Sequence, residues 1–332
     1  MAKIGLVGFF GWGNYGDELF HRIWENSLGQ VHETRLLHDK LEYPYFSRPA
    51  VDISKEVDAI VIGGGDLVIP NKISPLYWNK AWLQRPIYIS GVGVPTWIKH
   101  EAEDVMSRLR TFFQHKNVKY ISARDVESAE WIRKKLTPNV EVKHHADLAF
   151  SGVYPPARKF DKPTVGISLR THRAGSDPTV LLNACKELQR EGYDILNVVM
   201  GTGRTREGDL QVARDFPLDG QIIFESESID EISSTIGGLD LLISNKFHGT
   251  VVATTYGVSS VVLSSTSKSR NLYRRLGRTP LLSSATDENL LQKVRLAKMP
   301  ISEDAIRALR LEAFEGVHSV VRAVNRDFPS SF

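Results

Sequence analysis

Short apolar runs alternate along the first half of the chain with longer amphipathic segments. The apolar runs predict buried strands over residues 4–9, 59–62, 87–90 and 120–122, each ending at glycine, serine or a charged residue. The amphipathic segments predict helices over residues 17–28, 101–114 and 126–136. Strands and helices that alternate in this way indicate a parallel sheet covered on both faces.

The same pattern restarts after residues 153–163, where proline and charge are typical of a linker. Further strands are predicted over 165–169, 195–200, 222–224, 239–244 and 260–263, with helices over 178–191 and 303–325. A chain of 332 residues also exceeds the usual size of one hydrophobic core. We therefore predict an α/β protein with domains at 1–155 and 163–300, a C-terminal helix and tail at 301–332, and a cleft between the carboxyl edges of the two sheets.

Composition narrows the class of protein. Apolar residues make up 42% of the chain and charged residues 24%, as in ordinary soluble proteins. The net charge of +3 is too small to indicate a nucleic-acid partner. Cys185 is the only cysteine, which excludes an intrachain disulfide and a zinc site with several cysteine ligands. Without a signal-peptide pattern or an apolar stretch near the ~20 residues that span a bilayer, we expect a soluble, cytoplasmic protein.

Three glycine-rich turns follow predicted strands of the first domain. The first, Gly11 to Gly16, has the spacing of a dinucleotide-binding loop, but Asp17 and Glu18 directly after it would repel a phosphate. It could instead be a tight turn before a helix charged by Asp17, or a turn close to a substrate whose hydroxyls meet Asn14 and Asp17. The others contain Gly64, Gly65 and Asp66, and then Gly91 and Gly93, and together they favour a rim that faces a ligand.

Two charged segments of the first domain are interpreted as structural. Arg124 and Asp125 stand at a predicted helix start, where an ion pair needs no ligand. His144 and His145 resemble metal ligands, but neighbours on an extended segment point to opposite faces. We expect no metal there, and a structural role for Asp147.

The second domain supplies cations at its strand ends. Arg170, followed by Thr171, His172 and Arg173, ends the first strand, and arginine's planar fork suits a carboxylate or phosphate. Gly201 begins a turn that could bind an anion. In the basic run 268–278 we expect Lys268 and Arg270 near a ligand, and Arg274, Arg275 and Arg278 on a solvated helix face.

The segment Ser244 to Thr250 (SNKFHGT) follows the strand predicted at 239–244. It places Lys246, His248 and Gly249 where open α/β sheets bind ligands. Histidine, with an ordinary pKa of about 6.5, can transfer protons near neutrality. A core histidine bonded to the backbone is the structural alternative.

These motifs, in this order, resemble the polysaccharide pyruvyl transferase family. The resemblance runs from residue 4 to about residue 278 and is carried by GWGNYGDE (11–18), GGGD (63–66), GVG (91–93), SARDVES (122–128), Ala146-Asp147, SLR (168–170) and SNKFHG (244–249). It implies a GT-B-type fold of two Rossmann-like domains, and transfer of pyruvyl from phosphoenolpyruvate to two hydroxyls of one sugar as a cyclic ketal. The family has an arginine two residues before the histidine, where this chain has Lys246.

The resemblance and the residues together suggest roles. His248, Lys246 and Arg170 are the expected catalytic residues, with Gly249, Lys268 and Gly201 also binding the donor phosphoenolpyruvate. The acceptor, a sugar or lipid-linked oligosaccharide, is expected at Asn14, Asp17, Gly64, Gly65 and Asp66. No cofactor or metal is expected, and an acceptor of this kind would bring the protein to the inner face of a membrane.

Two other functions stay open at this stage. A glycosyltransferase that uses a nucleotide sugar shares the architecture and could hold a diphosphate with Arg170 and Lys246. A catalytically silent sugar-binding relative is the other, motivated by Lys246 in the family's arginine position.

Overall fold

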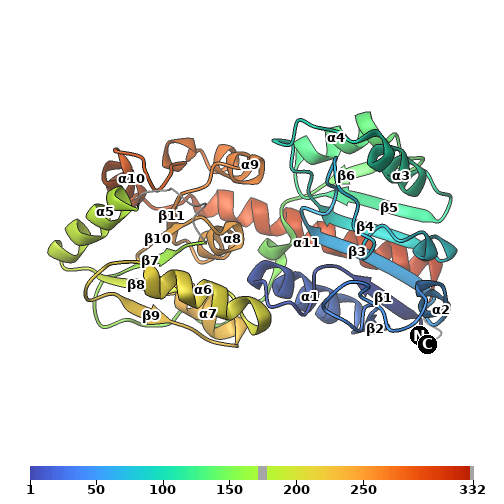
Figure 1. Ribbon diagram of the computed structural model, residues 1–332, viewed down its shortest axis with the longest axis horizontal. Coiled ribbons are helices and arrows are strands. Elements are labelled where there is room, and N and C mark those ends of the chain that lie inside the picture. Colours follow the sequence, from blue (N-terminus) through green and yellow to red (C-terminus); the bar gives the residue numbers. More distant parts are fainter. Residues whose placement is uncertain (171–177, 330–332) are drawn as a thin grey trace. The chain divides into compact units, whose positions relative to one another are not determined.

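A computed structural model describes residues 1–170 and 178–329, and it contains two compact units (Figure 1). Unit 1 consists of residues 1–11, 17–152 and the chain from Leu309 onward. Unit 2 consists of residues 153–308 together with the five residues Trp12–Gly16. The chain therefore contributes a short piece from near its beginning to the second unit.

Unit 1 is built on a six-stranded parallel sheet in the order β2-β1-β3-β4-β5-β6. Its strands are β1 Lys3–Val7, β2 Glu33–Leu36, β3 Ala59–Gly65, β4 Ile87–Val92, β5 Val118–Ala123 and β6 Val142–His144. The order reverses between β1 and β3, because the chain passes from β1 to β2 on one side and then returns to place β3 on the other. In open parallel sheets the crevice at such a reversal is the usual ligand site.

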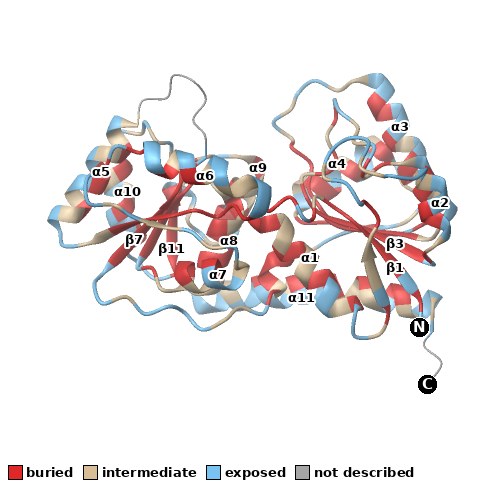
Figure 2. Ribbon diagram, turned by 60° about the horizontal axis from the view of Figure 1, so that its bottom comes forward, coloured by how far each residue is buried: buried red, intermediate tan, exposed pale blue. Residues whose placement is uncertain are grey.

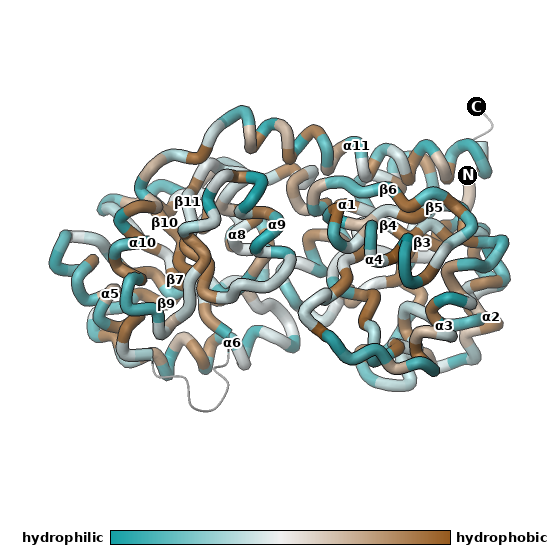
Figure 3. Tube along the Cα trace, turned by 90° about the horizontal axis from the view of Figure 1, so that it is seen from above, coloured by the Kyte–Doolittle hydropathy of each residue, from teal (hydrophilic) through white to brown (hydrophobic). Residues whose placement is uncertain are grey.

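Helices cover both faces of this sheet. They are α1 Tyr15–Leu28, α2 Ala50–Lys55, α3 Glu103–Phe113, α4 Val126–Leu136 and the main part of α11 Glu303–Asp327, with short 3₁₀ turns at Lys80–Gln84 and Leu148–Ser151. Apolar residues of α2, α3 and α4 share one core with the strands. In Figure 3 the strands lie between these helices and α11, which is joined to the sheet by the bond from the Tyr88 hydroxyl to Asp327 (2.6 Å).

Unit 2 repeats the plan with a five-stranded parallel sheet in the order β11-β10-β7-β8-β9. Its strands are β7 Thr164–Ser168, β8 Asp194–Val198, β9 Ile222–Phe224, β10 Leu241–Ser244 and β11 Ser259–Val262. Its helices are α5 Thr179–Arg190, α6 Gly203–Asp215, α7 Ile229–Gly237, α8 Phe247–Thr255, α9 Ser267–Arg275 and α10 Leu290–Ala297, with a 3₁₀ turn at Thr279–Leu281. Here the strand order reverses between β7 and β10, which are direct neighbours.

Burial explains why the apolar runs become strands. Central strands such as β3 and β4 are buried along their whole length, as a sheet covered on both faces requires (Figure 2). The predicted α/β class with parallel sheets is confirmed. Within the described part of the chain, no helix combines the length and apolar character needed to cross a membrane.

Some elements are not predicted by the apolar pattern. Strand β2 is only half-buried, so it lacks a continuous apolar run, and β6 is three residues long. Helices α6, α7, α8 and α10 are segments in which the apolar pattern predicts no helix. The expectation for Arg278 is wrong: it lies beyond the end of α9, donates to Ser259 Oγ (3.0 Å) and to the Met299 carbonyl, and burial lowers its pKa.

The buried thiol of Cys185 gives a direct test of the unit 2 core. Cys185 is fully buried on α5, and burial raises its pKa to about 12 because a thiolate is poorly solvated there. We expect no reaction with a disulfide-exchange reagent in the native protein at mildly alkaline pH, and complete reaction after denaturation. A Ser107→Cys control, on the exposed face of α3, should react at once in the native state. Rapid labelling of native Cys185 would contradict this packing.

Candidate functional site

The carboxyl ends of β7 and β10 carry the charged residues singled out by sequence. Ser168 and Ser244, the last residues of the two strands, are partners in register. Arg170 follows the first strand by two residues, and Lys246 and His248 follow the second. The three side chains therefore meet at the strand-order reversal of unit 2.

A pocket of about 280 Å³ lies at this point, and we call it the switch-point pocket. All of its lining residues belong to unit 2: Asn14, Tyr15, Gly16, Arg170, Met200, Gly201, Thr205, Asp209, Lys246, Phe247, His248 and Gly249. Six of the residues proposed for donor or acceptor binding are brought together here: Asn14, Arg170, Gly201, Lys246, His248 and Gly249.

One wall of the pocket comes from the segment Trp12–Gly16. The Gly13 carbonyl accepts from the Thr202 backbone N–H (2.8 Å) and from the Thr205 hydroxyl (2.6 Å). Gly13 has a φ of +87°, and a Cβ atom there would lie 1.8 Å from the Thr202 carbonyl oxygen. Asn14 then pairs with Gly201 in an antiparallel bridge. Glycine is thus required at position 13 because two backbones touch.

His248 packs against the same wall. It is the second residue of α8, and its ring lies 5.3 Å from that of Phe247. A Cβ atom on Gly16 would lie 1.8 Å from His248 Nδ1, so the imidazole occupies the space that a side chain at position 16 would need. The glycine of the GWGNYG loop therefore sets where the histidine can lie.

Lys246 is paired with a carboxylate that the sequence did not indicate. Its ammonium donates to Asp209 on α6, and both side chains are mostly buried, 15% and 17% exposed. Burial lowers the pKa of Lys246, the Asp209 carboxylate opposes that shift, and the nearby Arg170 adds to it. The pocket thus contains two cations and one carboxylate, besides the histidine.

Helix α8 begins at the pocket with Lys246 as its N-cap residue. The N–H groups of a first helical turn carry partial positive charge, which favours a bound anion. Gly249 in that turn leaves room for Met200, because a Cβ atom would lie 2.3 Å from Met200 Cε. Together with Arg170 and Lys246, the helix end makes this an arrangement suited to an anion.

Lys268 is not among the residues that line the pocket. The Lys268 ammonium lies over the Phe247 ring, 5.2 Å from the ring centroid, and Phe247 itself lines the pocket. Arg270 donates to the Ser265 carbonyl (2.8 Å) and also lies outside the lining. Thr171, His172 and Arg173 lie outside the described residues.

The other four proposed acceptor residues, Asp17, Gly64, Gly65 and Asp66, belong to unit 1. They lie after β1 and at the end of β3, at the strand-order reversal of that sheet. Gly64 and Gly65 both have positive φ, +89° and +87°, and a Cβ on Gly65 would lie 3.4 Å from an Asp17 carboxylate oxygen. None of these four residues is among those that line the switch-point pocket.

Arg124 is buried beside carboxylates of unit 1. Its guanidinium is 2% exposed, pairs with Asp66, and lies 3.9 Å from Asp125. Burial lowers the pKa of Arg124, while the carboxylates of Asp147, Asp125 and Asp17 oppose that shift. A Cβ on Gly93 would lie 2.4 Å from this guanidinium, so the glycine of the third turn makes room for it.

Two further interpretations can be compared with the structure. The Gly11 amide, which a dinucleotide phosphate would need, is bound by the Glu18 carboxylate at 2.8 Å. Asp147 caps the 3₁₀ turn at Leu148–Ser151 by accepting from the Ala149 amide (3.0 Å), as a structural residue would. Within residues 1–170 and 178–329, no cluster of histidine, cysteine or acidic residues could hold a metal ion.

Asp209 and Thr205 are the polar pocket residues that the sequence analysis missed. They are four residues apart on α6, so they share the helix face that borders the pocket. A helix predicted after the turn at Gly201 would have indicated that both side chains border the pocket. The sequence does not predict this helix because α6 has few apolar residues, and only Leu210 and Ala213 of α6 are buried.

Comparison with known proteins agrees with this architecture. Residues 14–267 match the family model described as polysaccharide pyruvyl transferase. No curated protein matches the chain. Among solved structures, a putative UDP-N-acetylglucosamine 2-epimerase from Listeria monocytogenes aligns with a TM-score of 0.64 and 10% identity, over 100% of this chain and 99% of that one.

Two further solved structures are similar. The S. aureus MnaA–UDP complex gives a TM-score of 0.63 at 11% identity, over 100% of both chains. The UDP-N-acetylglucosamine 2-epimerase from Rickettsia bellii gives 0.61 at 12% identity, over 98% of this chain and 96% of that one. At such identities the likeness shows the fold alone, which is of the GT-B type.

The contact between Gly16 and His248 can be tested with one methyl group. In Gly16→Ala the added Cβ must displace the imidazole, and we expect a loss of about 1–3 kcal/mol in the free energy of unfolding. The His248 ring signals in the NMR spectrum should shift as well. Gly208→Ala is the matched control, because no atom lies within 4 Å of its Cβ position on α6.

The control should stabilise the protein by about 0.5–1 kcal/mol through helix propensity. Unchanged His248 signals in Gly16→Ala would show that the ring does not depend on this glycine.

Proposed function

Because the chain belongs to the polysaccharide pyruvyl transferase family and is therefore a transferase, we propose that it moves pyruvyl from phosphoenolpyruvate onto a sugar. The two sugar hydroxyls and carbon 2 of the donor form a cyclic ketal, and phosphate is released. The observation that carries this proposal is the meeting of Arg170, Lys246 and His248 in one pocket at the start of α8.

The charges of the switch-point pocket support a small anionic donor. Arg170 offers a planar fork to a carboxylate or phosphate, and Lys246 with the α8 N-terminus adds positive charge. Since Asp209 already pairs with Lys246, that ammonium is fixed in direction before a ligand binds. The volume of about 280 Å³ lies just below the roughly 300–1,000 Å³ of drug-sized ligand sites, which favours a compact donor.

Lys246 stands where the family has arginine. A lysine ammonium is a compact point charge, whereas an arginine guanidinium can donate two parallel hydrogen bonds to one carboxylate or phosphate. In this chain Asp209 holds the ammonium and Arg170 lies close enough to influence the pKa of Lys246. We assign the bidentate contact with the donor to Arg170 and the charge on the phosphate to Lys246.

His248 is proposed as the proton donor. Its imidazolium gives a proton to the methylene carbon of phosphoenolpyruvate, which becomes a methyl group and leaves carbon 2 electrophilic. One sugar hydroxyl adds to carbon 2 and gives its proton to the neutral imidazole, which restores the imidazolium. The carbon–oxygen bond to phosphate then breaks, and the second hydroxyl adds at the same carbon and gives its proton to the departing phosphate. The sugar thus loses two protons: one replaces the proton that His248 gave to the methylene carbon, and the other leaves on the phosphate.

We propose Asn14, which lines the switch-point pocket, as a contact of the acceptor sugar. Asp17, Gly64, Gly65 and Asp66 of unit 1 are proposed as acceptor residues of that unit. Carboxylate and amide oxygens accept hydrogen bonds from hydroxyl groups, and the glycines allow close approach. We place the reaction in the cytoplasm, and a lipid-linked acceptor would bring the enzyme to the inner face of the membrane.

The test is phosphate release from phosphoenolpyruvate that depends on a sugar acceptor. We expect release with galactose-, glucose- or mannose-type acceptors and a fall of at least about a hundredfold in His248→Ala, because a general acid contributes about 10²–10⁴-fold. His100→Ala, an exposed histidine of unit 1, should retain full activity.

Nucleotide sugars are included in the same screen as alternative donors. Glycosyl transfer from one of them, with no release from phosphoenolpyruvate, would replace this proposal by a glycosyltransferase.

The pairing of Asp209 with Lys246 predicts a pH effect. A lysine must stay protonated to hold an anion, and burial already lowers the pKa of Lys246 below its ordinary value. Removing the carboxylate in Asp209→Asn lowers that pKa further, so the alkaline rise in KM for phosphoenolpyruvate should move to lower pH. Asp215→Asn, an exposed residue of the same helix, is the control and should leave the profile unchanged. If the pH profiles of KM are identical in the unmodified protein, Asp209→Asn and Asp215→Asn, Lys246 does not contribute to donor binding.

A further inference from the structure

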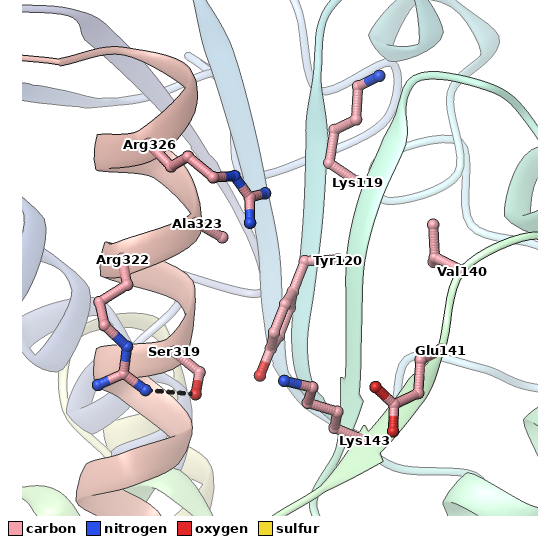
Figure 4. A pocket seen from close by; sticks show the side chains of 9 residues that line it. All are labelled: Lys119, Tyr120, Val140, Glu141, Lys143, Ser319, Arg322, Ala323 and Arg326. Atoms are coloured by element: carbon pink, nitrogen blue, oxygen red, sulfur yellow. Dashed lines mark hydrogen bonds between the residues drawn. The ribbon is translucent and has the colours of Figure 1, made fainter.

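A second pocket, of about 460 Å³, lies in unit 1 between the last two strands of the sheet and α11 (Figure 4). We call it the basic pocket. Four cations line it: Lys119 on β5, Lys143 on β6, and Arg322 and Arg326 on α11. None of its residues lines the switch-point pocket, so it is a separate surface of the molecule.

The cations come from elements that face one another. Arg322 and Arg326 are four residues apart, and therefore share one side of α11. Figure 4 shows Arg326 and Lys143 extending from opposite sides toward the space beside Tyr120, and the Lys143 ammonium lies 5.9 Å from the centre of that ring. An ordinary solvated helix face would not bring like charges from three elements together.

Carboxylates balance only part of this charge. Arg322 pairs with Glu315 and donates to Ser319 Oγ (3.1 Å), and Arg326 lies 3.2 Å from Asp327. Glu141 is the one acidic residue in the lining.

The two lysines are the cations left over. Among the residues that the structure describes, neither Lys119 nor Lys143 forms an ion pair, and Lys119 donates to the Lys116 carbonyl (3.1 Å). Lys143 and Arg326 extend toward the same space, and an anion between them would reduce the repulsion of these like charges.

We propose that the basic pocket binds a phosphate group. Lysine ammonium groups and arginine forks are the side chains that hold phosphate oxygens, and four of them line this pocket. The phosphate can belong to a soluble phosphorylated molecule or to the headgroup of an anionic lipid. Both present the same oxygens, and the two sources are distinguished by experiment.

Site-resolved lysine labelling tests the soluble source. The native protein is acetylated briefly with and without inorganic pyrophosphate, and the modified lysines are identified by mass spectrometry. We expect pyrophosphate to slow modification of Lys119 and Lys143 several-fold at low salt and to lose this effect at high salt. Lys134 and Lys186, exposed lysines of α4 and α5, should be modified at the same rate in both samples.

Sedimentation with vesicles tests the lipid source. Vesicles of phosphatidylglycerol mixed equally with phosphatidylcholine are compared with vesicles of phosphatidylcholine alone. If the lipid headgroup is the ligand, the protein binds the anionic vesicles, and Lys119→Gln/Lys143→Gln weakens binding about tenfold or more, since each lysine near an anionic surface contributes about 1 kcal/mol. Lys134→Gln/Lys186→Gln removes the same charge elsewhere and should bind as the unmodified sequence does.

Protection by pyrophosphate supports a soluble ligand, and binding to anionic vesicles that depends on Lys119 and Lys143 supports a lipid headgroup. The proposal is overturned if pyrophosphate does not protect these lysines and, in addition, the anionic vesicles either do not bind the protein or lose as much binding in the control double variant as in the pocket variant. Both readouts are independent of pyruvyl transfer, so failure of one proposal leaves the other intact.

Discussion

The backbone contact at Gly13 is the constraint on which the switch-point pocket depends. Its carbonyl receives the Thr202 amide and the Thr205 hydroxyl, and no side chain larger than hydrogen fits at this residue. That contact holds Asn14 beside Gly201 and brings Gly16 against His248. The loop Gly11 to Gly16 has the spacing of a phosphate-binding turn, but here its backbone forms one wall of the pocket. That wall determines the space left for His248.

Charge sets the second requirement of the site. Two cations near each other at a strand end would repel, and burial makes a lone ammonium costly. Asp209 reduces both costs without removing the positive charge, because Arg170 and the N-terminus of α8 remain. The same principle appears in unit 1, where the buried Arg124 is surrounded by Asp66, Asp125, Asp147 and Asp17. Asp17 and Asp66 follow β1 and β3, where the strand order of that sheet reverses, whereas Arg124, Asp125 and Asp147 follow β5 and β6.

The sequence predicts the part of this structure that depends on local pattern. Buried strands produce apolar runs, and residues directly after them, such as Arg170, Lys246 and His248, must lie at one edge of the sheet. Asp209 could not be found this way, because it lies on a helix with few apolar residues and meets Lys246 across 37 positions of sequence. The position of Lys268 over the Phe247 ring could not be found this way either, because that contact is tertiary.

The chain order has a consequence for synthesis. Gly13 and its partner Thr202 are separated by 189 positions, so the wall of the pocket is translated long before the helix that it contacts. At a translation rate of about 5–20 residues per second, the interval between the synthesis of Gly13 and that of Thr202 is roughly 10–40 s. During that interval the segment Trp12–Gly16 waits for most of the unit to which it belongs. A nascent chain that stalls before Thr202 would therefore carry this segment without the backbone contact that fixes it in the finished protein.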